Sequence, residues 1–354
     1  MKRFALGAVL VWSSAACVSG PIPPAVPSAG AALPHTVRVQ FSEQGVTGVR
    51  LVIEDVPLEE YAQATALSEV APAAGEVGAV ERLLEVQTII SRTYAVSHLG
   101  RHAREGFDLC STTHCQLFEP RRLRTSKWAA ASSEAVARTA GVILTFDRQP
   151  AQALFHADCG GYTSTASAVW GGADRPYLIA RADDGAASDA HAAWQYEASL
   201  ADLTAALDVS GRLDAIDVVS RDDAGRAERI AVQTRDRDAG TASSSTVLPG
   251  DEFRQRLTRA FGPRALRSTK FDVRRTGAMF VFSGRGYGHG VGLCQAGAFA
   301  RLRAGATPAD VVRYYYPGVA LSRGSGFGAR GSEKPLTTSP RSLSSPEPRA
   351  PNPD

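Results

Sequence analysis

Two histidines and two cysteines stand close together in one short stretch of the chain. Thiolate and imidazole groups are the ligands that zinc prefers, and four of them can close a tetrahedral structural site. The spacing is not that of a standard zinc finger, and the adjacent His114 and Cys115 need a sharp turn to face one ion. A local Cys110–Cys115 disulfide and a pair of free thiols are the alternatives. The residues that raise this choice are His102, Cys110, His114 and Cys115.

A glutamate ends the first predicted helix among apolar neighbours. Glu69 follows Leu67 and precedes Val70 and Pro72. A carboxyl group in apolar surroundings can have a raised pKa and act as a general acid. The alternative is an ordinary solvated glutamate near a helix end, and composition alone favours that alternative.

A dense glycine segment surrounds one histidine near the end of the chain. Six of the fifteen residues of 284–298 are glycine, and His289 stands between two of them. Glycine lets the backbone approach a ligand closely, so the segment indicates a binding surface. It lacks the Gly-Lys-Ser/Thr ending of a nucleotide P-loop and the setting of a dinucleotide fingerprint.

Polar and aromatic residues follow a third predicted strand end. The segment 155–163 contains Gly160 and Gly161, and Trp170 and Tyr177 lie downstream. Aromatic rings on an open surface suit the apolar faces of sugars. The alternative is a tight turn with aromatic residues in the core. The chain lacks a His-Glu-x-x-His metalloprotease motif and a Gly-x-Ser-x-Gly nucleophile elbow.

The elements that must position these residues predict an α+β fold, with mixed strands and helices around a substrate cleft. Residues 36–41 alternate between apolar and polar side chains, which indicates a half-buried strand, and 48–53 is expected to be its hairpin neighbour. Residues 142–146 and 151–156 are expected to form a strand pair across a short turn, and 280–282 is expected to be a strand that leads into the glycine segment. Helical spacing is clearest over 77–98, with further helices expected over 126–139, 295–303 and 310–316. Another helix is expected to begin with Asp55 as its cap and to end near Glu69. Residues 198–262 are expected to form an accessory lobe or insertion.

Both ends of the chain differ in composition from the middle. Residues 1–17 read as an export signal, and Cys17 after two alanines resembles a lipoprotein cleavage box, with simple secretion as the alternative. Residues 18–35 are expected to be a linker, and 323–354 a disordered tail. The net charge of +3, without a basic stripe that contains aromatics, gives no case for a nucleic-acid partner.

Taken in order, these segments resemble the stage II sporulation protein D / LytB amidase-enhancer family, here called the SpoIID/LytB family. The resemblance covers 37–321, nearly the whole mature chain. Its motifs are Pro57-Leu-Glu-Glu-Tyr61 with Ser68-Glu69, 85–95, 108–116, Cys159-Gly-Gly-Tyr-Thr163 with Trp170, 284–298, and Tyr314-Tyr-Tyr-Pro-Gly318.

The resemblance implies a peptidoglycan lytic transglycosylase that cuts MurNAc–GlcNAc bonds of denuded glycan strands to 1,6-anhydro products. Glu69 occupies the place of the family's catalytic glutamate, and one carboxyl group serves as acid and then base. The resemblance also implies structural zinc in the loop that holds His102, Cys110, His114 and Cys115. The residues expected to bind substrate are Gln87, Arg92, Tyr94, Gln116, Gly160, Gly161, Tyr162, Thr163, Tyr287, His289 and Gln295.

The resemblance leaves a second function open, a non-catalytic enhancer of a cell-wall amidase, which would then be a partner beside the glycan strands. It implies an exported protein of the cell envelope, periplasmic or on the outer surface, with membrane contact only through a lipid on Cys17. Cys294 stands where serine is frequent in the family. Because the motifs of Cys159 and Cys294 are expected to border one cleft, we expect the two thiols to lie close together and to be able to form a disulfide.

Overall fold

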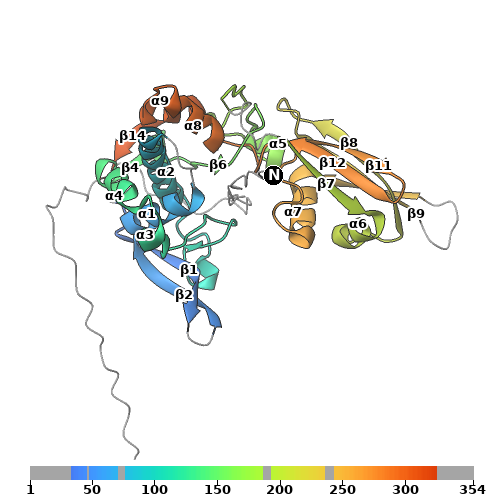
Figure 1. Cartoon of the computed structure of the whole chain (residues 1–354), viewed down its shortest axis with the longest axis horizontal. Coiled ribbons are helices and arrows are strands. Elements are labelled where there is room, and N and C mark those ends of the chain that lie inside the picture. The colour runs from blue at the N-terminus through green and yellow to red at the C-terminus, as the bar shows by residue number, and fades with distance from the viewer. Residues whose placement is uncertain (1–32, 46–47, 71–75, 186–192, 236–242, 325–354) are drawn as a thin grey trace, which may run out of the picture.

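The computed structural model describes residues 33–45, 48–70, 76–185, 193–235 and 243–324. The described chain forms two lobes with separate hydrophobic cores (Figure 1). The mixture of helices with several small sheets confirms the predicted α+β class. The predicted export signal, Cys17, most of the linker and most of the tail lie outside the described residues. No helix within the described ranges is long and apolar enough to cross a membrane.

The first lobe is built around a helix that is buried on all sides. Helix α2 runs from Val77 to Ser97, and every residue from Val86 to Ser97 is buried. A helix that is enclosed all round belongs to the interior of a domain. Around it lie α1 (Leu58–Glu69), α4 (Ala129–Arg138), α8 (Gln295–Arg303) and α9 (Pro308–Tyr315) (Figure 1).

A β-hairpin leads into α1, and it is longer than the sequence predicted. Strand β1 (Thr36–Gly45) pairs antiparallel with β2 (Gly48–Pro57) along its whole length. Asp55 therefore lies in the ladder opposite Arg38, and the prediction that it caps the helix is wrong. The helix begins at Leu58 without a side-chain cap. Strand β3 (Leu109–Cys110) pairs parallel with β1 and fixes the start of the loop that carries Cys110.

Two further small sheets join distant parts of the first lobe. Strand β4 (Val142–Phe146) pairs with β5 (Gln149–Pro150) and with β14 (Ala320–Arg323). The predicted pairing of 142–146 with 151–156 is wrong, because β6 (Phe155–His156) pairs instead with β13 (Leu293–Cys294). The remaining short elements of this lobe are η1 (Ala103–Glu105), α3 (Arg122–Thr125) and α5 (Ala166–Trp170).

The second lobe holds two three-stranded sheets and two helices, and its core extends from Trp194 to Phe282. This is wider than the predicted 198–262, because strands on both sides of that range complete its sheets. One sheet has the order β11-β12-β7 and the other β10-β9-β8. The elements are β7 (Ala193–Ser199), α6 (Leu200–Leu207), β8 (Arg212–Arg221), β9 (Ala227–Arg235), β10 (Ser243–Pro249), α7 (Gly250–Phe261), β11 (Phe271–Thr276) and β12 (Met279–Arg285).

A buried arginine ties the second lobe to the first. Arg226 is 1% exposed, and it donates to the carbonyl oxygens of Cys159 at 3.1 Å and Gly288 at 3.0 Å. Gly290, at φ +87°, lies so close that a β-carbon there would meet the Arg226 guanidinium at 2.4 Å. Arg226 therefore positions the glycine segment, and only glycine fits beside it.

We expect Arg226→Ala to lower the free energy of unfolding by about 2 to 4 kcal/mol, because two buried carbonyl groups lose a charged donor. Urea unfolding measures the change. Arg229→Ala is the matched control, because Arg229 is exposed on the neighbouring strand. Equal stability of the two variants would contradict the role given to Arg226.

Candidate functional site

Glu69, the last residue of α1, has a buried carboxyl group in which one oxygen accepts a hydrogen bond and the other has no hydrogen-bond partner among the described residues. The side chain is 2% exposed, and its Oε1 accepts a hydrogen bond from the backbone N–H of Leu117 at 2.7 Å. Its Oε2 is buried and has no hydrogen-bond partner among the described residues. Burial raises the pKa of Glu69 to about 8, although the Leu117 hydrogen bond opposes the shift. The carboxyl group is therefore mostly protonated at neutral pH.

The loop that provides Leu117 is held onto α1 by the side chain directly before Glu69 and by one about two helical turns earlier. Ser68 Oγ donates to Ala64 O at 2.7 Å and accepts from the N–H of Glu119 at 3.1 Å. Tyr61 donates its hydroxyl to Gln116 Oε1 at 3.1 Å. The Tyr61 ring also stacks on Phe118, with the centroids 5.3 Å apart. These contacts keep water from Glu69 and explain its burial.

The glycine segment reaches Glu69 through Gln295, the first residue of α8. Gln295 Nε2 donates to Gln87 Oε1 at 3.1 Å, and it lies 3.5 Å from the backbone oxygen of Glu69, 226 residues away in sequence. Gln87 also donates to Ser91 Oγ at 3.3 Å. Two of the predicted substrate-binding residues thus lie beside Glu69.

His289 has a different set of neighbours. Its Nδ1 accepts from the N–H of Val291 at 3.0 Å, so the ring carries its proton on Nε2, which is buried without a hydrogen-bond partner in the described chain. Its ring centroid lies 5.0 Å from that of Trp170, which donates to Asp251 of the second lobe. Burial lowers the pKa of His289 to about 3, so the imidazole is neutral. The contacts of His289 point toward the junction of the lobes rather than to Glu69.

The four residues predicted to bind zinc come together in the loop before Leu117. One donor atom from each of His102, Cys110, His114 and Cys115 lies within 4.8 Å of the others. His114 Nδ1 is 3.7 Å from both sulfur atoms, and His102 Nε2 is 3.4 Å from Cys115 Sγ. A tetrahedral zinc ion separates a sulfur ligand from a nitrogen ligand by about 3.6 Å. The geometry and the donor types therefore fit a metal ion.

Two further features suit the cluster to a cation. His102 Nδ1 lies 2.9 Å from Glu105 Oε1, and such a carboxylate fixes the tautomer of a histidine that ligates through its other nitrogen. The hydrogen bond between the two thiols lowers the pKa of Cys110, with help from His114 and Thr112, and raises the pKa of Cys115, so that one of the pair is favoured as a thiolate. A thiolate is the form in which cysteine binds metal.

Comparison with known proteins agrees with this arrangement of motifs. A family model described as Stage II sporulation protein, SpoIID, matches residues 47–146, which hold Glu69 and the histidine–cysteine cluster. Stage II sporulation protein D of Bacillus subtilis (strain 168) is 28% identical over 287 residues, which cover 78% of this chain and 77% of that protein. The chain is therefore similar to SpoIID/LytB proteins over most of its length.

The other similar proteins extend the SpoIID/LytB relationship beyond the first lobe. Stage II sporulation protein D of Bacillus amyloliquefaciens is 27% identical over 289 residues. The amidase enhancer of Bacillus subtilis (strain 168) is 26% identical over 280 residues, 68% of this chain and only 38% of that longer protein. A second family model, a domain of unknown function (DUF8618), matches residues 188–292.

Two of the residues expected to bind substrate are buried in the interior of the first lobe, where other protein groups surround them. Arg92 is fully buried, where it forms an ion pair with Glu59 and donates to the carbonyl oxygen of Val142 at 2.9 Å. Tyr94 is also fully buried, and its ring stacks on His98 with centroids 3.9 Å apart. These contacts hold α1, α2 and β4 together.

The Cys159-Gly-Gly-Tyr-Thr motif forms a turn that the second lobe fastens. Gly160 and Gly161 have φ values of +67° and +94°, and Lys270 donates to Gly160 O at 3.0 Å. Thr163 donates its hydroxyl to Ile179 O at 3.0 Å, and Tyr162 pairs with Ala182. Tyr287 exchanges backbone hydrogen bonds with Asp158, and its hydroxyl lies 3.4 Å from Pro263 O. The described contacts of this motif are all with other parts of the protein, and they fix the shape of the turn.

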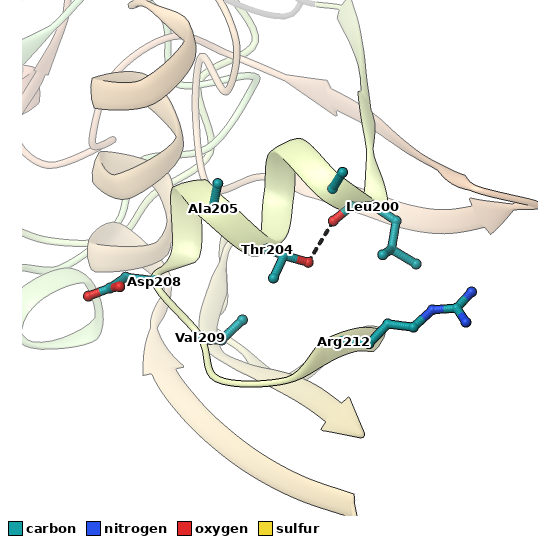
Figure 2. A pocket seen from close by; sticks show the side chains of 7 residues that line it. Leu200, Thr204, Ala205, Asp208, Val209 and Arg212 are labelled. Carbon is teal, nitrogen blue, oxygen red and sulfur yellow. Dashed lines mark hydrogen bonds between the residues drawn. The ribbon is translucent and has the colours of Figure 1, made fainter. Parts of the chain in front are cut away.

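One hollow on the surface of the described chain lies elsewhere. It has a volume of about 670 Å³ and is lined along α6 in the second lobe, from Leu200 to Arg212 (Figure 2). Most of its lining is apolar, and none of the predicted site residues belongs to it. Among its described lining residues, this hollow has no ionisable groups in contact with one another, so it is a weaker candidate for catalysis than the buried carboxyl group of Glu69.

Sequence reasoning missed two groups that shape the site. The backbone N–H of Leu117 is the donor to Glu69, and a backbone group leaves no signal in a sequence. Arg226, which binds the glycine segment, follows an ordinary Asp/Gly turn, and no motif in the surrounding sequence marks it as important. Only the packing of the two lobes reveals its part.

Proposed function

We propose that this protein acts on peptidoglycan as a lytic transglycosylase, which cleaves MurNAc–GlcNAc bonds of denuded glycan strands to 1,6-anhydro products. The single observation that carries the proposal is the buried Glu69, with its raised pKa and its open Oε2. Similar proteins are named for sporulation and for amidase enhancement, and these names support a role in the cell wall, for example during sporulation. The function requires a location in the cell envelope outside the cytoplasm.

The proposed reaction needs one carboxyl group that works twice. Protonated Glu69 donates its proton to the glycosidic oxygen as the bond from that oxygen to C1 of the muramic sugar breaks. The carboxylate then accepts the proton of the muramic O6 hydroxyl while O6 forms its bond to C1. The product is a 1,6-anhydro sugar, Glu69 is protonated again, and no water is consumed. Hydrolytic glycosidases use a pair of carboxyl groups instead.

Other residues near Glu69 have positioning roles in this proposal. The Leu117 N–H holds Oε1, so that Oε2 is the oxygen available to the sugar. Gln295 and Gln87 form a polar pair beside the end of α1, where amide groups can bind hydroxyl or acetamido groups of the strand.

We further propose that His102, Cys110, His114 and Cys115 hold a structural zinc ion. Four protein ligands leave no open position, so the ion supplies no reaction step and acts by ordering the loop. That loop ends at Leu117, whose N–H binds Glu69.

The decisive experiment for the activity offers the purified protein two substrates. Denuded glycan strands should yield soluble fragments with 1,6-anhydromuramic ends, identified by mass spectrometry. Strands that keep their stem peptides and a boiled enzyme serve as comparisons. Reducing-end products without the anhydro bond would instead indicate a hydrolase, and intact strands would contradict the catalytic proposal.

A non-catalytic enhancer of a cell-wall amidase is the second candidate, because an amidase enhancer matches 68% of this chain. That function predicts that a purified amidase releases stem peptides faster in the presence of the protein, while glycan strands alone stay intact. The same preparation used for the strand assay tests both outcomes.

The pKa of Glu69 predicts the pH dependence of the reaction. Glu69 must be protonated at the start, and its pKa is about 8. We therefore expect kcat/KM to be level below about pH 8 as far as this group is concerned, and to fall about tenfold per pH unit above it. Initial rates of anhydro-product release across this range measure it. A rate that rises through pH 8 would contradict Glu69 as the acid.

A further inference from the structure

A second group of metal-binding residues lies outside the histidine–cysteine loop. His156, Cys159 and Cys294 are each fully buried, and one donor atom of each lies within 4.8 Å of the others. They come from β6, the turn after it and β13, where Cys294 pairs with His156 in the parallel ladder. The expectation that Cys159 and Cys294 lie close together is confirmed, and both are free thiols.

The orientation of His156 leaves one ring nitrogen without a function in the protein. Its Nδ1 lies 3.2 Å from the carbonyl oxygen of Val291. Because a carbonyl oxygen can only accept, Nδ1 carries the proton and Nε2 carries a lone pair. Nε2 is buried and has no hydrogen-bond partner among the residues that the structure describes. A histidine that donates from one nitrogen to a backbone carbonyl and offers the other is the usual arrangement of a metal ligand.

Two backbone N–H groups lie close to the sulfur atom of Cys294. Cys294 Sγ lies 3.2 Å from the backbone N–H of Cys159 and 3.4 Å from that of Gly297. Arg226 adds a buried positive charge on the other side of Cys159. Asp183 opposes this, with Oδ2 3.8 Å from Cys159 Sγ, but Arg301 neutralises it at 3.0 Å.

We propose that His156, Cys159 and Cys294 form a second metal site, which takes a thiophilic divalent ion of the Zn²⁺ class. Two thiolates, one neutral imidazole and a divalent cation have no net charge, which suits a fully buried position. Three protein donors are also the number in zinc sites that keep one position for a water molecule. A Cys159–Cys294 disulfide is the competing state, and it leaves the His156 Nε2 lone pair without a partner.

The position of the site connects it to Glu69 without making it part of the reaction. Cys294 is directly followed by Gln295, which lies against the backbone of Glu69. An ion at Cys294 therefore fixes the first turn of α8 against β6. The inference does not depend on the proposed function, because metal content is measured without any substrate.

The test measures zinc bound per chain in the full-length protein, expressed with Zn²⁺ and dialysed. Wild type should hold about two equivalents, and the double variants Cys110→Ser/Cys115→Ser and Cys159→Ser/Cys294→Ser about one each. In the first variant, Co²⁺ in place of Zn²⁺ should give sulfur-to-cobalt charge-transfer absorption. Cys294→Ser in that background should lower the absorption by about half.

Two results would overturn the proposal. One is a Cys159–Cys294 disulfide in non-reduced peptides from protein prepared with zinc present. The other is an unchanged zinc content in Cys159→Ser/Cys294→Ser. Because serine is close in size to cysteine, this variant should fold, and circular dichroism checks it. If it does not fold, alkylation of the Cys110→Ser/Cys115→Ser variant, mapped by mass spectrometry of its peptides, decides, since bound Zn²⁺ protects Cys159 and Cys294 until a chelator is added.

Discussion

Glu69→Gln is expected to lower the release of 1,6-anhydro products by about two to four orders of magnitude, the usual contribution of a general acid–base group. Glutamine keeps an oxygen that can accept from the Leu117 N–H at the place of Oε1, so the packing around the end of α1 should persist. What is lost is the proton of the carboxyl group. Quantitative mass spectrometry of digests from denuded strands measures the change.

The control for this variant is a second glutamate, Glu119, on the loop that packs against the end of α1. Glu119→Gln removes a carboxylate whose partners are Arg121 and Arg122 at the surface, and it should keep nearly full activity. If Glu69→Gln turns over strands as fast as Glu119→Gln, the assignment of Glu69 fails. If Glu69→Gln still stimulates an amidase while the wild type cuts no strands, the enhancer function is correct.

The stability of the same variant separates a lost proton donor from a damaged fold. The pKa of Glu69 is raised from 4.5 to about 8 in the folded protein, so the folded state binds more protons than the unfolded state between these values. The contribution of Glu69 to stability is therefore full below about pH 4.5 and is lost as the pH rises toward 8. By pH 7 the loss is on the order of 3 kcal/mol. Glutamine does not titrate, so Glu69→Gln should unfold at higher urea than wild type near pH 8.

Removal of metal from the His102–Cys115 loop is expected to have the second largest effect. A chelator should lower the activity severalfold or more and should make the loop around Leu117 susceptible to proteolysis, because a structural ion supplies much of the folding energy of a short loop. His102→Gln should weaken zinc binding, while His35→Gln is the matched control, because His35 is exposed and outside the cluster. Zinc content, limited proteolysis and strand cleavage are measured on one preparation.

The outcome also distinguishes zinc from the disulfide first considered for this loop. A Cys110–Cys115 disulfide would leave the protease resistance of this loop unchanged by chelators and would make it sensitive to reducing agents. Zinc predicts the opposite on both counts. A loop that keeps its protease resistance and its activity after complete loss of metal would contradict the structural role.

The sequence predicted best those features that depend on neighbouring residues. Helix α1 ends at Glu69 and α8 covers 295–303, as local patterns indicated. The four candidate metal ligands are close in sequence, so a single loop was enough to bring them together. The prediction for Asp55 was wrong because aspartate suits a helix cap, while the β1–β2 ladder extends past this residue to Pro57.

Features that depend on distant contacts could not be predicted. The strand end at His156 pairs with β13 across more than a hundred residues, and a two-residue strand carries no periodicity. The role of Arg226 requires two lobes to meet. The unused nitrogen of His156 follows from the orientation of one ring, which no sequence pattern sets.

The position of Glu69 at the very end of α1 has an electrostatic consequence of its own. The carboxyl end of a helix is the negative pole of its macrodipole, so an anion formed there meets unfavourable partial charges. The last turn of α1 has no basic residue to offset this pole. The helix direction thus adds to burial in favouring the protonated acid. In the proposed reaction, the Glu69 carboxylate is therefore destabilised and regains a proton quickly. This favours rapid attack of the muramic O6 on C1 of the same sugar, before water can enter.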